Sequence, residues 1–181
     1  MNEEGHSVII ELLDTERHDR ERFSCGVDTV DNYFRKTANK LAKAGNARVY
    51  VMTSETGDVI GFYALNAHSV DFTELPSRYA RTRPSHGAIP AAFISMIGLD
   101  QRYAGKGHGG DLLADALLRI EQAAERIGIA MVVLDVLDDG NPDFVRRRKT
   151  LYLRYGFEAL PSNPLRLFLP VAAIRESLAP L

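Results

Sequence analysis

The chain has 181 residues, a length typical of one compact domain, and we expect a single domain over residues 1–181. Its 45% hydrophobic and 25% charged residues exclude a disordered, collagen-like or disulfide-rich chain. The net charge of −2 at pH 7 excludes a globally basic nucleic-acid binder but leaves room for a local basic patch. Because Cys25 is the only cysteine, the chain by itself can form neither a disulfide nor a cysteine-based zinc cluster.

The N-terminal sequence MNEEGHSVII is acidic and lacks the basic and apolar regions of a secretory signal. No apolar run approaches the roughly 18 residues that a membrane helix needs. We therefore expect a cytoplasmic protein in a reducing compartment, with no membrane partner. The histidines show no paired metal-ligand spacing, so we expect no metal.

The first third of the chain predicts a strand, a helix and a hairpin. Ser7–Leu13 is rich in β-branched residues and predicts a strand. Asp28 can cap a helix whose apolar residues recur at helical spacing, and Gly45 can end it. The strand-like runs Arg48–Thr53 and Val59–Leu65 are joined by four turn-forming residues, which predicts a β-hairpin.

The segment Phe72–Ile89 follows and lacks clean periodicity of either kind. Pro76 and Pro84 interrupt it, so we expect a loop with at most a turn of helix. A loop of this length in a small domain is often functional.

A strand, a glycine-rich turn, a helix and a second strand follow in that order, which predicts a βαβ unit with a parallel strand pair and a right-handed crossover. Asp143–Arg154 can then form a helix, and Phe157–Pro170 supplies further strand residues. The parts of the βαβ unit are the apolar run Ala91–Leu99, the turn Gln101–Gly110, a helix with an apolar face that ends at Gly128, and the strand Met131–Val136.

The turn Gln101–Gly110 places backbone N–H groups at the positive end of a helix dipole, which suits a phosphate or pyrophosphate. The spacing is not a Walker A motif, because Lys106 is followed by Gly107, and it fits the dinucleotide fingerprint poorly. Taken alone, the turn fits a structural role as well as it fits phosphate binding.

Two ordered motifs resemble the GNAT acetyltransferase superfamily. The run Arg102–Gly107, between a buried strand and an amphipathic helix, resembles its R/Q-x-x-G-x-G/A signature. Leu151–Phe157 is similar to its F-Y-x-x-x-G-F segment. Residues 23–34 and 59–65 look like the matching parts of the TacT-like branch, the acetyltransferase toxins of toxin–antitoxin pairs. The resemblance spans most of the chain.

This resemblance implies a GNAT-like mixed α/β fold. Its central sheet would have six or seven mostly antiparallel strands flanked by helices, with the fourth and fifth strands splayed around acetyl-CoA.

The resemblance also implies acetyl-CoA as the donor. The strand of Ile97 and Leu99 would pair with the pantetheine arm and turn amides toward the oxyanion of the reaction. Tyr152 would be the general acid, because a phenol with a pKa near 10 is protonated at neutral pH. The alternative is that Tyr152 is a core aromatic with a satisfied hydroxyl. The cofactor-binding residues implied are Ile97, Leu99, Arg102, Ala104, Gly105, Lys106, Gly107, His108, Gly109 and Gly110.

The activity implied is N-acetylation, with the amine of an aminoacyl-tRNA as acceptor. A protein N-terminus or a small-molecule amine is an alternative acceptor, and a CoA-binding module without turnover is an alternative function. An aminoacyl amine has a pKa near ~8 and is partly neutral without a strong base. Glu11, Asp100 and His68 are candidate bases by residue type alone. The partners implied are a ribbon-helix-helix antitoxin and a second copy of the chain.

The chain departs from the family between the strand ending at Val136 and Tyr152. This link is longer than usual, carries the basic run Arg146–Lys149, and leaves Asn141 in doubt as a ligand. The run is either a solvated helix face or a contact for tRNA phosphates. Arg78, Arg81 and Arg83 of the long loop and the lysines of the first helix would add to the second interpretation. Cys25 fits a small buried hydrophobe better than a nucleophile.

Overall fold

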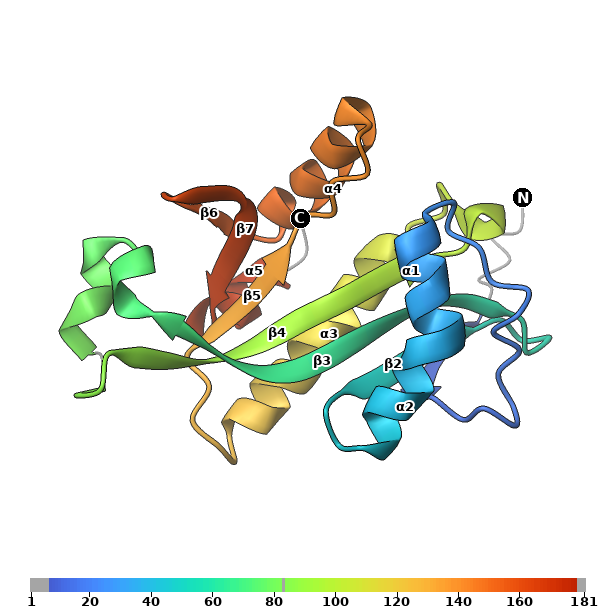
Figure 1. The fold of residues 1–181 in the computed structure, drawn as a ribbon, viewed down its shortest axis with the longest axis horizontal. Coiled ribbons are helices and arrows are strands. Elements are labelled where there is room, and N and C mark those ends of the chain that lie inside the picture. Colours follow the sequence, from blue (N-terminus) through green and yellow to red (C-terminus); the bar gives the residue numbers. More distant parts are fainter. Residues whose placement is uncertain (1–6, 83, 179–181) are drawn as a thin grey trace. The chain divides into compact units, whose positions relative to one another are not determined.

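The computed structural model describes residues 7–82 and 84–178, and Figure 1 shows the elements that they form. The strands are β1 Ile9–Leu12, β2 Arg48–Thr53, β3 Val59–Asp71, β4 Ala88–Leu99, β5 Met131–Asp135, β6 Glu158–Leu160 and β7 Asn163–Pro170. The helices are α1 Asp28–Asn32, α2 Ala38–Lys43, α3 His108–Ala124, α4 Pro142–Arg154 and α5 Ile174–Ser177.

The strands form a seven-stranded sheet in the order β1-β2-β3-β4-β5-β7-β6. The pairs β1–β2, β2–β3, β5–β7 and β6–β7 are antiparallel, and β4 is parallel to β5. The expected mixed, mostly antiparallel sheet is therefore confirmed, as is the parallel strand pair of the βαβ unit. The chain packs as two compact units: residues 7–65 and 96–115 form the first, and 66–95 and 116–178 form the second. β3, β4 and α3 each contribute residues to both units.

The first unit has an aromatic core. The rings of Phe34 and Phe62 stack with centroids 4.1 Å apart, and Phe23 meets them edge-on at 5.0 and 5.4 Å. All three side chains are buried completely. Burying such large apolar groups stabilises the fold by roughly 1.5–3 kcal/mol per side chain. The core therefore joins the segment before α1, the chain after α1, and β3.

The predicted single helix from Asp28 to Gly45 is wrong in its interior. The structure has α1, a π turn over Tyr33–Thr37, and α2, and Asp28 is the first helical residue rather than the cap. The buried residues Val30, Phe34 and Ala38 are four residues apart. In an α-helix, which has 3.6 residues per turn, this spacing would rotate each successive side chain further around the helix axis. The π turn has a longer repeat and keeps the three side chains on one face.

The second unit contains the parallel strand pair. Here β4 pairs with β5 from Ala91 opposite Met131 to Ile94 opposite Leu134. The segment Phe72–Ile89 is less irregular than predicted, because it contains 3-10 turns over Phe72–Glu74 and Ser77–Thr82 and because β4 already begins at Ala88. Arg83 lies outside the described residues.

Helix α4 belongs to the second unit and extends away from β5 and β7 in Figure 1. Asn141 caps it: the side-chain oxygen accepts hydrogen bonds from the N–H groups of Asp143 at 3.0 Å and Phe144 at 3.4 Å. Pro142 occupies the first helical position, where its missing N–H costs nothing. The side chain of Asn141 thus serves as the N-cap of α4.

Within residues 7–82 and 84–178, no helix is long and apolar enough to cross a membrane. In the same ranges, no cluster of three or more His, Cys, Asp or Glu side chains could hold a metal ion.

Candidate active site

The glycine-rich turn between β4 and α3 depends on two glycines with left-handed backbone conformations. Gly105 has φ +77° and Gly107 has φ +85°, values that side-chain-bearing residues rarely adopt. A Cβ atom at either position would meet no atom within 4 Å. The requirement for glycine therefore comes from the backbone conformation and not from packing.

This turn leaves a set of amides open for an anion. The N–H groups of Ala104 and Gly110 already donate, to the carbonyls of Gln101 at 3.2 Å and Gly107 at 3.0 Å. Among the described residues, the N–H groups of Gly105, Lys106 and Gly107 donate to no acceptor. They precede the first turn of α3, whose dipole favours negative charge. Residues 105–107 thus offer open amides to the expected pyrophosphate site.

Asp100 anchors the start of this turn. Its carboxylate, 1% exposed, accepts hydrogen bonds from the N–H and Nε of Arg102, both at 2.9 Å, and from the N–H of Ser24 at 3.1 Å. Burial opposes ionisation, but these bonds and the charge of Arg102 leave the pKa of Asp100 below its ordinary value. Asp100 is therefore an ionised anchor and a poor candidate for a base. Sequence patterns missed this role, because Ser24 lies 76 residues away.

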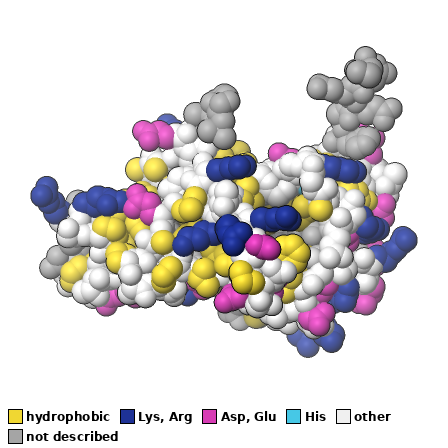
Figure 2. Space-filling model, turned by 90° about the horizontal axis from the view of Figure 1, so that it is seen from above, with side chains coloured by type: hydrophobic (Ala, Val, Ile, Leu, Met, Phe, Trp, Pro, Cys, Tyr) yellow, Lys and Arg dark blue, Asp and Glu magenta, His cyan; other side chains and the backbone are white. Residues whose placement is uncertain are grey.

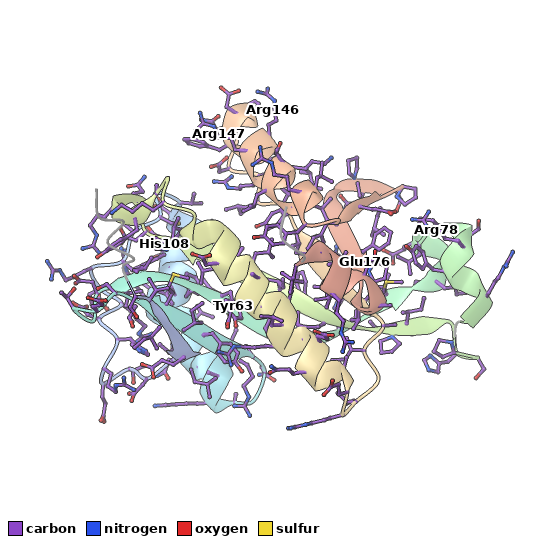
Figure 3. The ribbon with its side chains drawn as sticks, turned by 180° about the vertical axis from the view of Figure 1, so that it is seen from behind. Tyr63, Arg78, His108, Arg146, Arg147 and Glu176 are labelled. Carbon is purple, nitrogen blue, oxygen red and sulfur yellow. The ribbon has the colours of Figure 1, made fainter. Side chains whose placement is uncertain are left out.

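The remaining turn side chains have distinct surroundings. Lys106 places Nζ 5.6 Å from the ring centroid of Tyr103, and the guanidinium of Arg102 lies 5.5 Å from the same centroid. His108, labelled in Figure 3, is 8% exposed, and its Nδ1 is 3.5 Å from a carboxylate oxygen of Asp111. Arg102 is held by Asp100, and the ring of His108 is buried, so neither side chain extends freely from the turn.

Ile97 and Leu99 follow the β4–β5 pairs, which end at Ile94. Both side chains are half-buried, and they alternate with the buried Gly98 and Asp100 along the strand. Their predicted pairing with pantetheine requires backbone groups on β4 beyond those pairs, and it stays a prediction.

Tyr152 lies in the last turns of α4 and is 6% exposed. Its ring meets Phe157 edge-on at 6.1 Å. Burial raises the pKa of Tyr152 to about 12, against a smaller lowering by the charge of Arg148, so the phenol is protonated at neutral pH. Among the described residues, the hydroxyl makes no hydrogen bond to protein. The general-acid role of Tyr152 therefore stays a prediction, beside the alternative of a core aromatic.

The other candidate bases and the cysteine lie in surroundings of different kinds. Glu11 binds Arg17 at 2.7 Å, and hydrogen bonds from Arg17 and His18 lower its pKa. The ring of His68 lies 5.1 Å from that of Phe93. Burial raises the pKa of the half-buried Cys25 to about 12, so its thiol is a poor nucleophile.

The basic run on α4 splits into two groups. Arg148 donates to the carbonyl of Leu137 at 3.0 Å and to Asp139 at 2.9 Å, so it fastens α4 to the preceding loop. Arg146 and Arg147 are exposed. Helical spacing therefore divides these arginines between different sides of α4. Arg78 of the long loop pairs with Glu158 and is partly neutralised.

No family model matches the chain. A probable toxin TacT from Sinorhizobium fredii is 62% identical over 169 residues, 93% of each chain. A tRNA-acetylating toxin from Mycobacterium tuberculosis is 33% identical over 165 residues, 91% of this chain and 92% of that protein. The chain belongs to the TacT-like acetyltransferase toxin family.

Solved structures of TacT-like toxins share the fold. A Tyr-to-Phe mutant of KacT aligns with a TM-score of 0.82 at 22% identity, covering 93% of this chain and 98% of that one. AtaT complexed with acetyl-methionyl-tRNAfMet aligns at 0.81 with 23% identity, covering 94% and 98%. The GNAT-like fold predicted from the two motifs is thereby confirmed.

Proposed function

We propose that the chain is an acetyl-CoA-dependent N-acetyltransferase toxin that acetylates the amine of aminoacyl-tRNA. The observation that carries the proposal is the 33% identity, over more than nine-tenths of both chains, to a toxin named for acetylating tRNA. The open amides of residues 105–107 and the protonated Tyr152 supply the chemistry that this reaction needs.

In this proposal the glycine-rich turn binds the pyrophosphate of acetyl-CoA through Gly105, Lys106 and Gly107. The backbone around Ile97 and Leu99 holds the pantetheine arm and places amides near the thioester oxygen. The neutral acceptor amine attacks the thioester carbonyl, a C–N bond forms, and the C–S bond breaks. Tyr152 donates its proton to the departing thiolate and regains one from solvent, while the amine releases its own proton to water.

The proposal includes a single catalytic domain over residues 1–181. It also includes the two partners that the TacT-like resemblance implies, a ribbon-helix-helix antitoxin and a second copy of the chain, and the cytoplasmic location that the sequence predicts. A mutant of the AtaT toxin has been solved bound to the C-terminus of the antitoxin AtaR and acetyl-CoA, and KacTA has been solved in complex with DNA.

The decisive test is transfer of label from acetyl-CoA to a pool of charged bacterial tRNAs, beside uncharged tRNA, peptides and polyamines. Label on charged tRNA alone is the expected result. Label on peptides or small amines alone would move the chain to the wider acetyltransferase superfamily. Acetyl-CoA binding without any transfer would instead indicate a CoA-binding module.

A further inference from the structure

A small cavity lies beside the glycine-rich turn, and its lining belongs entirely to the first unit. It has a volume of about 280 Å³ and is bounded by the glycine-rich turn, the turn between β2 and β3, and Val8 and Ile60. This volume is just below the range of about 300–1,000 Å³ that is typical of sites for drug-sized ligands. The cavity therefore suits a small metabolite.

A buried histidine distinguishes this cavity from an ordinary surface depression. His108 lines it, is 8% exposed, and is the first residue of α3 (Figure 3). Its Nδ1 is buried and makes no hydrogen bond to the described residues, although a carboxylate oxygen of Asp111 lies 3.5 Å away. Buried polar atoms are nearly always paired, because an unpaired one costs free energy. A polar ligand in the cavity would supply the missing partner.

Two opposite charges enter the cavity from separate turns. The ammonium group of Lys106 forms no ion pair within residues 7–82 and 84–178. The carboxylate of Glu55 accepts one hydrogen bond there, from the N–H of Ser7 at 3.2 Å. Exposed cations are common on this molecule, as the dark blue side chains in Figure 2 show, so Lys106 alone would indicate nothing. A cation, an anion and a buried imidazole around one small cavity are together complementary to a zwitterion.

The remaining lining favours an apolar group between these charges. Val8, Ile60 and the ring of Tyr103 supply apolar surface. The hydroxyls of Ser54 and Thr56 also line the cavity, but they are hydrogen-bonded to each other at 2.9 Å and need no polar partner from a ligand. An α-amino acid with an aliphatic side chain has the three parts that this lining matches, namely a carboxylate, an ammonium group and an apolar group.

The charges of the lining argue against other occupants. An internal peptide segment has neither an ammonium nor a carboxylate on its backbone, and the C-terminus of a peptide would leave Glu55 without a cation. A phosphate compound would place two negative charges beside the Glu55 carboxylate. A free amino acid satisfies Glu55 and Lys106 at the same time.

We propose that this cavity binds a free α-amino acid with an aliphatic side chain. Lys106 and His108 hold its carboxylate near the positive end of α3, and Glu55 holds its ammonium group. The apolar part of the lining covers its side chain.

The bound amino acid weakens the binding of acetyl-CoA, and this consequence rests on the proposed function. Lys106 belongs both to the cavity and to the set of residues 105–107 that binds the pyrophosphate in that proposal. A carboxylate beside Lys106 neutralises its charge and repels the pyrophosphate at the same end of α3. Linkage requires acetyl-CoA to weaken amino-acid binding by the same factor. The toxin is then restrained while free amino acid is plentiful.

Binding is tested by adding L-leucine to the full chain and following the backbone amides in proton–nitrogen correlation spectra. The amides of the glycine-rich turn and of the turn between β2 and β3 should shift. N-acetyl-leucine lacks the ammonium group and leucinamide lacks the carboxylate, so each should bind roughly tenfold more weakly, which corresponds to about 1.4 kcal/mol for one charged contact. Glycine, which has no side chain, should also bind more weakly than leucine.

Two variants locate the site. Glu55→Gln should lower the affinity for leucine roughly tenfold, and Thr56→Trp, which fills the cavity from an exposed turn position, should abolish binding. Glu16→Gln changes an exposed carboxylate elsewhere in the same unit and should match wild type. The spectra of the free variants verify that each is folded. Without leucine, Glu55→Gln and Glu16→Gln should keep the wild-type Kd for acetyl-CoA.

The inhibitory effect is tested by measuring the Kd for acetyl-CoA with and without saturating leucine. Leucine should raise this Kd about fivefold or more in wild type and in Glu16→Gln, at the lower end of typical coupling between two sites. It should leave the Kd of Thr56→Trp unchanged.

No binding of leucine to wild type, unchanged binding in both Glu55→Gln and Thr56→Trp, or equal affinities for leucine and its three analogues would overturn the amino-acid site. Leucine binding with an unchanged Kd for acetyl-CoA would overturn the inhibitory effect. Leucine binding to a protein that acetylates no charged tRNA would overturn the proposed function and leave the site in place.

Discussion

Tyr152 combines a buried ring with a hydroxyl that makes no hydrogen bond to the described residues. We expect Tyr152→Phe to lower kcat by roughly 10²–10⁴-fold, the range for loss of a general acid, and to keep the Kd for acetyl-CoA within about twofold. Steady-state kinetics and calorimetry measure the two quantities. Tyr155→Phe removes a phenol hydroxyl just after the same helix and serves as the matched control. An unchanged kcat in Tyr152→Phe would remove the residue from the catalytic assignment.

The raised pKa of Tyr152, about 12, also predicts a pH profile. The acid form persists up to that value, so kcat/KM for charged tRNA should rise with pH as the acceptor amine deprotonates near ~8 and then level off. Initial rates between pH 6 and 10, corrected for ester hydrolysis, measure the profile. A falling limb between pH 8 and 10 would mean that the acid is another group, with a lower pKa.

Asp100 is a residue whose charge links stability to pH. Its pKa is lowered in the folded state, so it stabilises the fold above the unfolded value of about 3.9, and this stabilisation is lost as the pH falls through the folded value. Asp100→Asn should lower the free energy of unfolding at pH 7 by about 1–3 kcal/mol, since Arg102 is 45% exposed and partly screened. Urea unfolding at pH 7 and at pH 3 tests this, because the difference should shrink at the lower pH. Asp143→Asn, at a carboxylate with 72% exposure, should change little.

At the scale of elements, β3, β4 and α3 approach one another closely at a glycine of the first unit. A Cβ on Gly61 would lie 2.6 Å from a methyl of Leu112 and 2.8 Å from the carbonyl oxygen of Gly98. The leucine can rotate, but the carbonyl belongs to the sheet backbone. Gly61→Ala should therefore lower the free energy of unfolding by about 1–3 kcal/mol in a denaturant titration. Gly128→Ala, where a Cβ would meet nothing within 4 Å, is the control and should be close to neutral.

The elements that the sequence predicted well are those with local signals. The hairpin of β2 and β3 and the parallel strands around α3 follow from apolar patterns and turn residues. The π turn at Tyr33–Thr37 could not be predicted, because the apolar spacing there suits both kinds of helix. The cap at Asn141 had a readable signal in Asn-Pro-Asp. The site roles of the glycine-rich turn and Tyr152 came from family motifs and stay predictions.

For the whole molecule, acetyl-CoA binding should raise stability by mass action. At a ligand concentration of 100 times Kd, the free energy of unfolding should increase by about 2.7 kcal/mol. Gly107→Ala should abolish most of that increase, because the required φ is +85°. Gly140, with φ +81°, has a similar backbone conformation but lies outside the glycine-rich turn. Gly140→Ala is therefore the control, and acetyl-CoA should raise its free energy of unfolding by the full amount. Urea titrations with and without acetyl-CoA measure both, and an equal loss in the two variants would contradict the assignment of the turn.

Cys25 has a consequence for experiments on the intact protein. With a pKa of about 12, only about one thiol in a hundred thousand is ionised at pH 7, so peroxide and maleimide should react with it slowly. A single cysteine introduced on an exposed position such as Arg126 would then carry a dye almost alone, with the native thiol left in place. The protein is thereby suited to single-site fluorescent labelling without prior cysteine removal.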